Sequence, residues 1–445
     1  MKEFMKKYRM KRILSLLTVL TLAFGVMCVP VSSYTNDVRT STNDMILVNV
    51  DTNTVVFSQK PDNKWFIGYL VALTTYLVAC DSIASPEKTS FTVTQEYIDQ
   101  IPYSDGCLNA YIGKKLTCKD LMAIALLTTG SDASIALADL SGMALDEFVT
   151  AMNEKVESLG CTGTHFVSPG YSSDRTQNTT CRDLYRIYMA VRDTKLFSEL
   201  TKDKIYVPDG LDPEKFTVES NASILNSNSP YYFRYTNDAK FSYTDETYQN
   251  IALTTTYKGK TYFFAGLLGY NRSEENVYAD ARKLTTWAYL NLSDRKVIDS
   301  ESELSPVKIV SSWGEYEMKL FPFNSSYKTL PNDFDESLLS YSINMKTKYN
   351  WPLFKGQKIG DAKITYDKEQ IEDVNLVLES SEGVDMLSDS ARFGKYVFDR
   401  LLSDNPLIVS SKHLSEKEEL SKATTEPSVS GTAASQTAAS EAAQE

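Results

Sequence analysis

The feature that most constrains this chain is a run of sixteen residues without a single charge, Trp65–Cys80. The run is shorter than the roughly 20 residues that a helix needs to cross a bilayer. A helix without a charged face has no side that it can turn to water, so other parts of a folded domain must surround it. The run therefore predicts a helix buried at the centre of a globular domain.

The charge balance limits which partners this domain can bind. The 445 residues include 46 basic and 58 acidic side chains, which gives a formal net charge of −12. An acidic chain is a poor nucleic-acid binder, because binding to phosphates depends on Lys and Arg. The two histidines are His165 and His413, and the six cysteines form no CxxC pair. We therefore expect no nucleic-acid partner, no metal and no cofactor.

The N-terminal 33 residues resemble an export segment. Six Lys or Arg and one Glu stand in the first dozen residues, and an apolar run, Ile13–Val31, leads to Ser32 and Ser33. This order is typical of a secretory signal, and we favour cleavage near Ser33 over a retained anchor that would associate with the membrane. In either case the protein is expected outside the cytoplasm, secreted or membrane-tethered. Cleavage would change the net charge from −12 to −17, because it removes six positive charges and one negative charge.

The patterns that follow alternate between strands and helices. Two hairpins are predicted, Met45–Val50 with Thr54–Phe57, and Ile251–Tyr257 with Thr261–Leu268. Besides the buried run, helices are predicted at Leu121–Leu127, Phe148–Leu159, Arg182–Val191 and Ala279–Leu290. Thr117 and Asp120 have the spacing of a capping box at the start of one of them. Hairpins mixed with helices favour an α+β fold over regular βαβ units.

The composition divides the chain into segments. We expect a linker at 34–44, a first domain at 45–293 and a small β-domain at 300–383, with the boundary at the polar stretch Asp294–Pro306. The strands predicted in the β-domain are Val307–Val310, Tyr316–Phe321, Ser340–Met345, Lys363–Tyr366 and Val374–Leu378. An amphipathic helix at 386–402 is better explained as a domain cap than as a membrane-surface helix, since acidic residues dilute its basic face. The Ser/Ala-rich tail at 410–445 predicts disorder.

An ordered series of short motifs runs from Gly113 to Tyr171. It comprises Gly113-Lys114-Lys115-Leu116-Thr117, Asp120-Leu121-Met122, Ala125-Leu126-Leu127, Asp132-Ala133, Ala136-Leu137-Ala138-Asp139, Met152-Asn153, Leu159-Gly160 and Thr164-His165-Phe166-Val167-Ser168-Pro169-Gly170. In order and spacing the series resembles the serine-type D-Ala-D-Ala carboxypeptidases, peptidase family S11, which are the low-molecular-mass penicillin-binding proteins of the bacterial cell wall. Cys181-Arg182-Asp183-Leu184 and Trp351–Gly360 resemble later segments of the same family.

The resemblance implies a fold and a set of catalytic motifs. The fold is a penicillin-binding, β-lactamase-like transpeptidase domain, an antiparallel sheet with helices, followed by a small β-domain. The motifs are S-x-x-K, an S-D-N-type triplet and K-T-G. In them a serine at a helix start attacks the peptide, and a lysine one turn later takes the proton. The triplet holds the peptide, and the third motif, on an edge strand, supplies a cation and a hydroxyl for the terminal carboxylate.

The first motif is absent from the matching positions. The serine position falls on Gly68 and the lysine position on Val71, and Trp65–Cys80 contains no Ser, Lys, Asp, Glu or His. Thr74 and Thr75 carry hydroxyls but have no basic residue within a turn, so we interpret them as packed helix residues. No intact catalytic residue is therefore expected.

The other two motifs are altered. The second falls on Thr129-Gly130-Ser131, where an amide has been replaced by a hydroxyl. The third falls on Lys240-Phe241-Ser242, where the cation remains and the bulky Phe241 is expected to face the cleft. Thr129, Ser131 and Lys240 are the candidate ligand-binding residues.

Three other segments imitate these motifs. Ser85-Pro86-Glu87-Lys88 and Ser293-Asp294-Arg295-Lys296 both have the S-x-x-K pattern, and Lys260-Thr261-Tyr262 lacks the glycine of K-T-G. The first is in a predicted loop, the second at the predicted boundary and the third in a hairpin turn. None provides a buried helix start, and we expect none to be catalytic.

Three functional hypotheses remain, of which the third is a purely structural partner for another wall enzyme. The first is an exported, catalytically inactive homologue that binds a peptidoglycan stem peptide or a cell-envelope protein. The second is an active serine-type D-Ala-D-Ala carboxypeptidase that trims stem peptides with unconventional residues. We favour the first, because losing the nucleophile and the base together removes the acyl-enzyme route. We also expect that restoring Ser at 68 and Lys at 71 does not recover activity.

Overall fold

The structure is a computed structural model that describes residues 38–101, 106–201, 204–269, 277–311, 314–345 and 356–379. These residues fall into two compact units. One holds residues 38–305 with 320–345 and 358–377, and the other holds residues 306–319 with 356–357 and 378–379, less the gaps in the described ranges. Each unit is treated by itself below.

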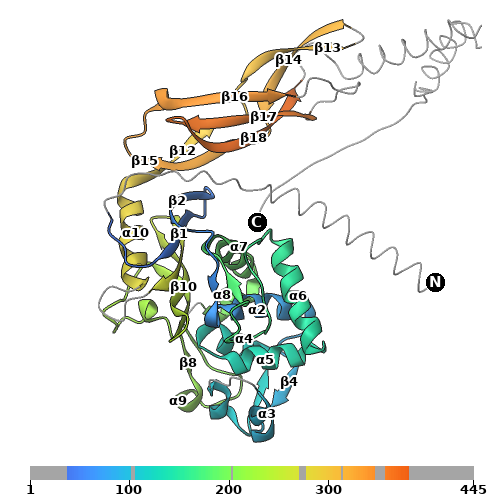
Figure 1. Cartoon of the computed structure of the whole chain (residues 1–445), viewed down its shortest axis with the longest axis vertical. Helices are drawn as coiled ribbons and strands as arrows, with labels where there is room; N and C mark the ends of the chain where they lie inside the picture. Colours follow the sequence, from blue (N-terminus) through green and yellow to red (C-terminus); the bar gives the residue numbers. More distant parts are fainter. Residues whose placement is uncertain are drawn as a thin grey trace, which may run out of the picture. The chain divides into compact units, whose positions relative to one another are not determined.

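A five-stranded antiparallel sheet forms the centre of the first unit (Figure 1), with the strand order β2-β1-β11-β10-β9. Its strands are β1 (Asp44–Asn49), β2 (Thr54–Gln59), β9 (Thr236–Thr244), β10 (Tyr248–Tyr257) and β11 (Lys260–Gly269). Both predicted hairpins, β1 with β2 and β10 with β11, are confirmed. The edge strand β9 pairs only with β10 among the described strands, which leaves its other edge toward the helices.

Helices cover both faces of this sheet, which is why β1 is buried at all six positions. Its alternate residues enter two different cores. Ile46 and Val48 join the cluster formed with the helices of residues 68–201, while Met45 and Leu47 join the cluster under the C-terminal helix α10. A strand that is buried on both faces is apolar throughout rather than alternating.

The helices of the unit are α2 (Ala72–Ser82), α3 (Gln95–Gln100), α4 (Cys118–Leu127), α5 (Ser131–Leu140), α6 (Leu145–Ser158), α7 (Cys181–Arg192), α8 (Lys195–Thr201), α9 (Pro213–Phe216) and α10 (Val277–Asn291). Short 3-10 helices are η1 (Gly68–Val71), η2 (Cys107–Tyr111) and η3 (Ser223–Leu225). Two-stranded pairs complete it: β3 (Trp65–Phe66) with β6 (Asn178–Thr179), β4 (Ser90–Thr92) with β5 (Lys115–Thr117), and β7 (Ile205–Tyr206) with β8 (Val218–Glu219).

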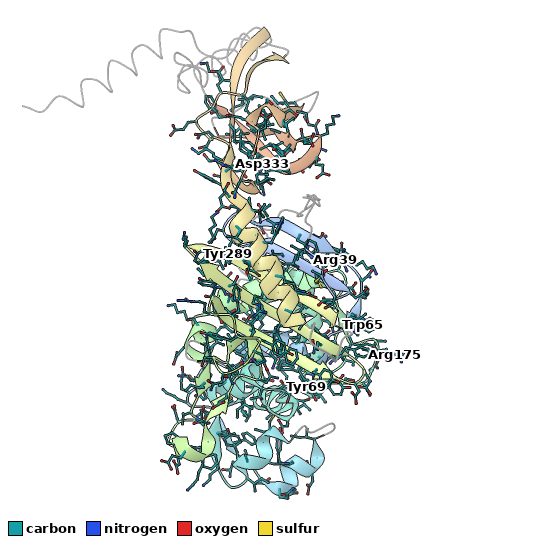
Figure 2. The ribbon with its side chains drawn as sticks, turned by 90° about the vertical axis from the view of Figure 1, so that its left-hand side faces the viewer. Arg39, Trp65, Tyr69, Arg175, Tyr289 and Asp333 are labelled. Carbon is teal, nitrogen blue, oxygen red and sulfur yellow. The ribbon has the colours of Figure 1, made fainter. Side chains whose placement is uncertain are left out.

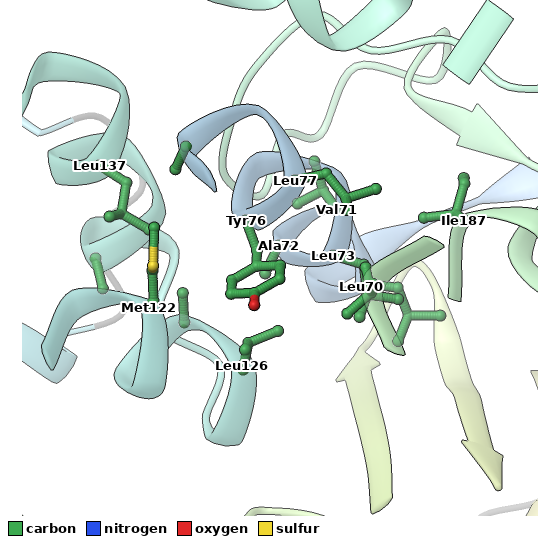
Figure 3. Close-up of a cluster of buried hydrophobic side chains, with 14 of the residues drawn as sticks. Leu70, Val71, Ala72, Leu73, Tyr76, Leu77, Met122, Leu126, Leu137 and Ile187 are labelled. Atoms are coloured by element: carbon green, nitrogen blue, oxygen red, sulfur yellow. The ribbon is translucent and has the colours of Figure 1, made fainter. Parts of the chain in front are cut away.

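The charge-free run is a buried helix only in its second half. Every residue of α2 from Ala72 to Ala79 is buried, in contact with α4, α5 and α7 (Figure 3). The expectation that the helix begins at Trp65 is wrong, because Trp65–Phe66 is strand β3 and Gly68 has a left-handed backbone, with φ of +57°. A residue in that conformation cannot continue an α-helix, so the chain turns there before α2 begins.

The predicted start of α4 is confirmed in detail. The Thr117 hydroxyl accepts a hydrogen bond from the Asp120 N–H at 3.1 Å, and the Asp120 carboxylate accepts one from the Thr117 N–H at 2.7 Å. Each side chain thus satisfies a backbone donor that the first helical turn leaves unpaired.

The C-terminal strands are β12 (Leu292–Ile298), β13 (Ser305–Ser311), β14 (Gly314–Pro322), β15 (Ser326–Pro331), β16 (Leu339–Met345), β17 (Lys358–Tyr366) and β18 (Glu369–Glu379), with η4 (Glu336–Leu338). In the first unit β12 pairs with β15, and β17 lies between β16 and β18. All five predicted strands of the β-domain are present. The start of the predicted boundary stretch, Asp294–Pro306, is occupied by β12, and the domain limits 45–293 and 300–383 stay predictions.

Several expectations fall outside the described residues. These are the export segment 1–33, residues 34–37 of the linker, the Trp351–Lys355 part of the family resemblance, the helix at 386–402 and the tail at 410–445. Within the described ranges no helix combines the length and the apolar character needed to cross a membrane.

A closed candidate active site

The positions that correspond to the three motifs meet between the start of η1, the α4–α5 connection and the edge strand β9. Val71, Thr129, Ser131 and Lys240 line one small cavity together with Tyr69 and Tyr171. Gly68 lies next to Ser242 of β9. The fold thus brings together the residues that the sequence comparison singled out, although they are separated by more than 170 positions along the chain.

Gly68, the nucleophile position, has no space for a side chain. A Cβ atom built on Gly68 would lie 2.3 Å from the Ser242 Oγ and 3.3 Å from the Thr247 Oγ1. The Ser242 Oγ accepts a hydrogen bond from the Tyr69 N–H at 2.9 Å, and its residue is fully buried. The Ser242 hydroxyl of the third motif therefore occupies the space into which a serine side chain at position 68, in the first motif, would extend.

Val71, the base position, contributes only methyl groups to this site. It is 1% exposed and packs among the apolar side chains at the start of α2 that Figure 3 shows. The nearby Thr75 donates to the Pro169 carbonyl at 2.5 Å, and the buried Thr74 hydroxyl has no hydrogen-bond partner. Neither threonine hydroxyl hydrogen-bonds to an amine among the described residues, so neither is activated as a nucleophile.

The second motif holds the loop at Gly170 and Tyr171 in place. The Ser131 Oγ accepts a hydrogen bond from the Tyr171 N–H at 2.8 Å, and Ser131 is buried. A Cβ atom on Gly170 would lie 2.4 Å from the same oxygen, so the loop fits closely over this hydroxyl. Thr129 also lines the cavity and takes no part in this hydrogen bond.

Lys240 keeps its positive charge but directs it away from solvent. The residue is 2% exposed, and its Nζ donates to the Ala125 carbonyl at 2.6 Å and to the Thr128 carbonyl. These carbonyls belong to the C-terminal end of α4, where the unpaired oxygens and the helix dipole attract a cation. The amine thus connects β9 to the end of α4, and these hydrogen bonds go to backbone carbonyls and not to a substrate carboxylate.

The expectation that Phe241 faces the cleft is wrong. Lys240 and Ser242 point to the face of β9 that contacts α4 and η1, so the alternation of a strand turns Phe241 to the opposite face. There its ring lies 4.9 Å from the ring of Tyr278 on α10.

The cavity itself is too small for a ligand. About 140 Å³ of space lies between its lining atoms, part of it open to solvent, and no part of it admits a water-sized sphere. The Tyr69 and Tyr171 rings lie 5.2 Å apart over it, and the Tyr171 hydroxyl donates to Glu246. Burial, with the neighbouring Glu246 carboxylate, raises the pKa of Tyr171 to about 12, so this phenol stays protonated at neutral pH.

Other candidate groups lie elsewhere. The S-x-x-K imitation at Ser85 forms a turn, in which the Lys88 N–H donates to the Ser85 carbonyl, and Ser293 belongs to β12. His165 is exposed, and its backbone pairs with Asn178. Among the described residues no cluster of three or more His, Cys, Asp or Glu side chains could hold a metal ion.

Sequence reasoning missed the residues that close the site, namely Tyr69, Tyr171 and Thr247. One signal was present in the sequence: where the family motifs have Ser and Gly, this chain has Gly68 and Ser242. Which residues cover the cavity could not be seen from spacing, because the covering loop reaches it only through tertiary packing.

Comparison with known proteins places this geometry in context. The sequence model of the family described as D-alanyl-D-alanine carboxypeptidase matches residues 32–265, and that of the penicillin-binding protein 5 C-terminal domain matches residues 293–382. The chain is 26% identical over 255 residues to a D-alanyl-D-alanine endopeptidase of Escherichia coli, spanning 54% of this chain and 75% of the relative. It is 21% identical over 370 residues to the D-alanyl-D-alanine carboxypeptidase DacF of Bacillus subtilis, spanning 81% of this chain and 92% of the relative.

Solved structures with the same fold include penicillin binding protein 5 from Haemophilus influenzae, with a TM-score of 0.61 at 18% identity over 78% of this chain and 98% of that one. The D-alanyl-D-alanine carboxypeptidase DacD from Francisella tularensis gives 0.57 at 19% identity, over 78% of this chain and 94% of that one. These structures support the predicted fold: a mixed helix and antiparallel-sheet domain with a separate C-terminal β-domain.

Proposed function

Because the chain belongs to the D-alanyl-D-alanine carboxypeptidase family, we propose that it is an exported, catalytically inactive member that binds at the cell wall without cleaving peptides there. One observation carries this proposal: the nucleophile and base positions are Gly68 and Val71, and the Ser242 side chain occupies the space beside Gly68. Acyl transfer needs a hydroxyl within reach of a proton acceptor. Gly68 and Val71 supply neither of these groups at the two motif positions.

The ligand in this proposal is a peptidoglycan stem peptide or a cell-envelope protein. The named activities of the relatives, peptidases acting on D-alanyl-D-alanine, support the first. The small size of the cavity supports a contact outside the catalytic cleft, which suits an envelope protein or a larger piece of the wall. Sedimentation with purified peptidoglycan, compared with pull-down from envelope extracts, separates the two.

The proposal is tested by labelling the purified protein with a fluorescent penicillin and by measuring D-Ala release from a stem peptide. We expect neither labelling nor release, while an active relative such as DacF, treated in parallel, shows both. Covalent labelling that a single Ser, Thr or Lys substitution abolishes would instead establish the alternative, an active carboxypeptidase with unconventional residues. Ser242→Ala is the most informative substitution, because its hydroxyl lies closest to the family's nucleophile position.

Restoring the first motif is a second test. The double variant Gly68→Ser, Val71→Lys is expected to release no D-Ala, because a side chain at 68 meets the Ser242 Oγ and has to adopt a left-handed backbone. Measurable release by this variant would show that the site is closer to an active one than its geometry suggests.

A further inference from the structure

Relative to the family motifs, glycine and serine have changed places at Gly68 and Ser242, which lie next to each other in the closed site. The family motifs place a serine at the helix start and a glycine at the end of K-T-G, and this chain has the glycine on the helix side and the serine on β9. The distance of 2.3 Å between a Cβ at 68 and the Ser242 Oγ is well below the 3.0 Å that real Cβ contacts keep. A side chain at 68 therefore requires the Ser242 Oγ to leave its observed position and its hydrogen bond with the Tyr69 N–H.

We infer that Gly68 and Ser242 are a coupled pair, in which the Ser242 side chain is a plug that closes the ancestral peptide cleft. The inference rests on the proposed function and deepens it, because it assigns the exclusion of the peptide to one side chain. Ser242 fills the volume and accepts the hydrogen bond of the Tyr69 N–H, so the cleft is occupied by the protein's own hydroxyl. A ligand of this protein is then recognised outside the cleft.

The pair is tested by a double-mutant cycle on folding stability. Gly68→Ala is measured in the natural protein and in a Ser242→Gly background, by urea unfolding of the exported chain. The clash is present only in the first case, whereas the left-handed backbone is present in both. The coupling is the difference between the effect of Gly68→Ala on the unfolding equilibrium in the natural protein and its effect in the Ser242→Gly background.

Gly113 provides the matched control, because it has φ of +78° and no atom within 4 Å of a built Cβ. Gly113→Ala measures the left-handed penalty alone, about tenfold in the folding equilibrium constant. We expect Gly68→Ala to cost at least a hundredfold in the natural protein and about as much as Gly113→Ala in the Ser242→Gly background. An equal loss in both backgrounds would overturn the inference.

Loss of folding in the single variant does not end the test. If Gly68→Ala fails to fold while the double variant with Ser242→Gly folds, the coupling is established. If Ser242→Gly folds and the double variant does not, the inference is overturned. Penicillin labelling of the natural protein would refute the proposed function and leave this cycle untouched, so the two failures are distinguishable.

A second observation, independent of the cleft, concerns the N-terminal segment along α10. The buried Asp280 Oδ2 accepts hydrogen bonds from the N–H and the hydroxyl of both Ser41 and Thr42, at 2.7 to 3.1 Å. Val38 packs against the core cluster under the same helix. Arg39, which Figure 2 labels, therefore lies between the packed Val38 and the hydrogen-bonded Ser41.

This arrangement lines a groove of about 610 Å³ with three cationic side chains. Its lining residues are Val38, Arg39, Arg282, Lys283 and Thr286. The guanidinium groups of Arg39 and Arg282 make no hydrogen bond or ion pair within the part of the chain that the structure describes. The like charges of Arg39 and Arg282 repel each other in this groove, which has an electrostatic cost that a bound anion would remove.

We propose that the groove binds the phosphate groups of a polyphosphate chain. The guanidinium group offers a planar set of donors that matches phosphate oxygens in pairs, which favours phosphate over a simple halide. The net charge of −12 makes general attraction of polyanions weak, so binding has to be local to this groove.

The probe is long-chain inorganic polyphosphate, titrated into the exported chain at fixed salt. The variant Arg39→Gln, Arg282→Gln is expected to weaken binding at least tenfold. The variant Arg175→Gln, Arg234→Gln, which removes the same charge from two exposed arginines that lie over aromatic rings, is expected to bind as the natural protein does. Equal weakening in both variants, no binding by the natural protein, or binding to anionic phospholipid vesicles alone would each overturn the proposal.

Discussion

Lys240 shows how a residue type can persist while its partner changes. The third motif keeps its lysine, yet the amine donates to the Ala125 and Thr128 carbonyls at the end of α4. A buried ammonium has to be satisfied by hydrogen bonds, and these carbonyls provide them without a ligand. Identity at one motif position is therefore not sufficient to infer the substrate contact.

Phe241 gives a prediction about the opposite face of the same strand. Phe241→Thr, which restores the residue type of the family motif, is expected to lower the free energy of unfolding by about 1–3 kcal/mol, since the ring leaves Tyr278 and a cavity remains. Urea unfolding measures the loss. Tyr243→Thr is the control, because Tyr243 lies on the same strand and face but is 40% exposed, and it is expected to cost much less. Penicillin labelling of Phe241→Thr would contradict its placement away from the cleft.

Asp238 gives a prediction about pH. Burial raises the pKa of this carboxyl despite the opposing effect of Arg192 and hydrogen bonds from the Thr254 and Tyr188 hydroxyls. A carboxyl whose pKa is higher in the folded state favours folding while protonated, and this contribution is lost as the pH rises above about 4, the ordinary carboxyl value.

The measurement is the difference in unfolding free energy between the natural protein and Asp238→Asn. It is followed from about pH 4, near the ordinary carboxyl pKa, up to about pH 7. The natural protein is expected to lose stability relative to the Asn variant as the pH rises. A relative gain over that range would mean that the Arg192 pairing dominates the burial of Asp238.

At the scale of elements, helix α4 is the clearest case of local determination. Thr117 and Asp120 form a reciprocal cap, and Asp120 also accepts a hydrogen bond from the Tyr206 hydroxyl at 2.8 Å. The cap thus starts the helix and connects it to a distant strand.

Thr117→Ala is expected to lower the free energy of unfolding by about 1–2 kcal/mol, since the first turn of α4 loses the hydroxyl acceptor of its cap. Thermal or urea unfolding is the measurement. Thr117→Ser keeps the hydroxyl and is expected to cost only a few tenths, about 0.3 kcal/mol. Equal losses in the two variants would indicate that the methyl group, and not the cap, stabilises the helix.

At the scale of the whole molecule, a polar network connects the first hairpin to the strands that follow α10. The Asp294 Oδ1 accepts hydrogen bonds from the Asn49 Nδ2 at 2.9 Å and from the Thr329 hydroxyl at 2.8 Å. Thr329 and Asn49 are both fully buried. The three residues come from segments about 245 and 35 positions apart, all within the first compact unit.

Asp294→Ala is expected to lower the free energy of unfolding by about 1–3 kcal/mol, because two buried donors lose their acceptor. Asp299→Ala is the matched control, since Asp299 lies close by in sequence and its carboxylate makes exposed or half-buried contacts with Lys296, Ser325 and the Glu301 N–H. Its expected cost is below about 0.5 kcal/mol. Equal effects would mean that the network contributes nothing beyond a surface charge.

The sequence alone determined the parts that depend on near neighbours. The hairpins, the cap at Thr117 and the burial of Ala72–Ala79 follow from local turn chemistry and from the lack of charges. The sequence also shows directly that Trp65–Cys80 contains no Ser or Lys. Only the tertiary structure decided what Ser242, Phe241 and Lys240 contact. Their partners lie far away in the chain and are selected by strand alternation and close packing, in which one residue of shift would turn each side chain to the other face.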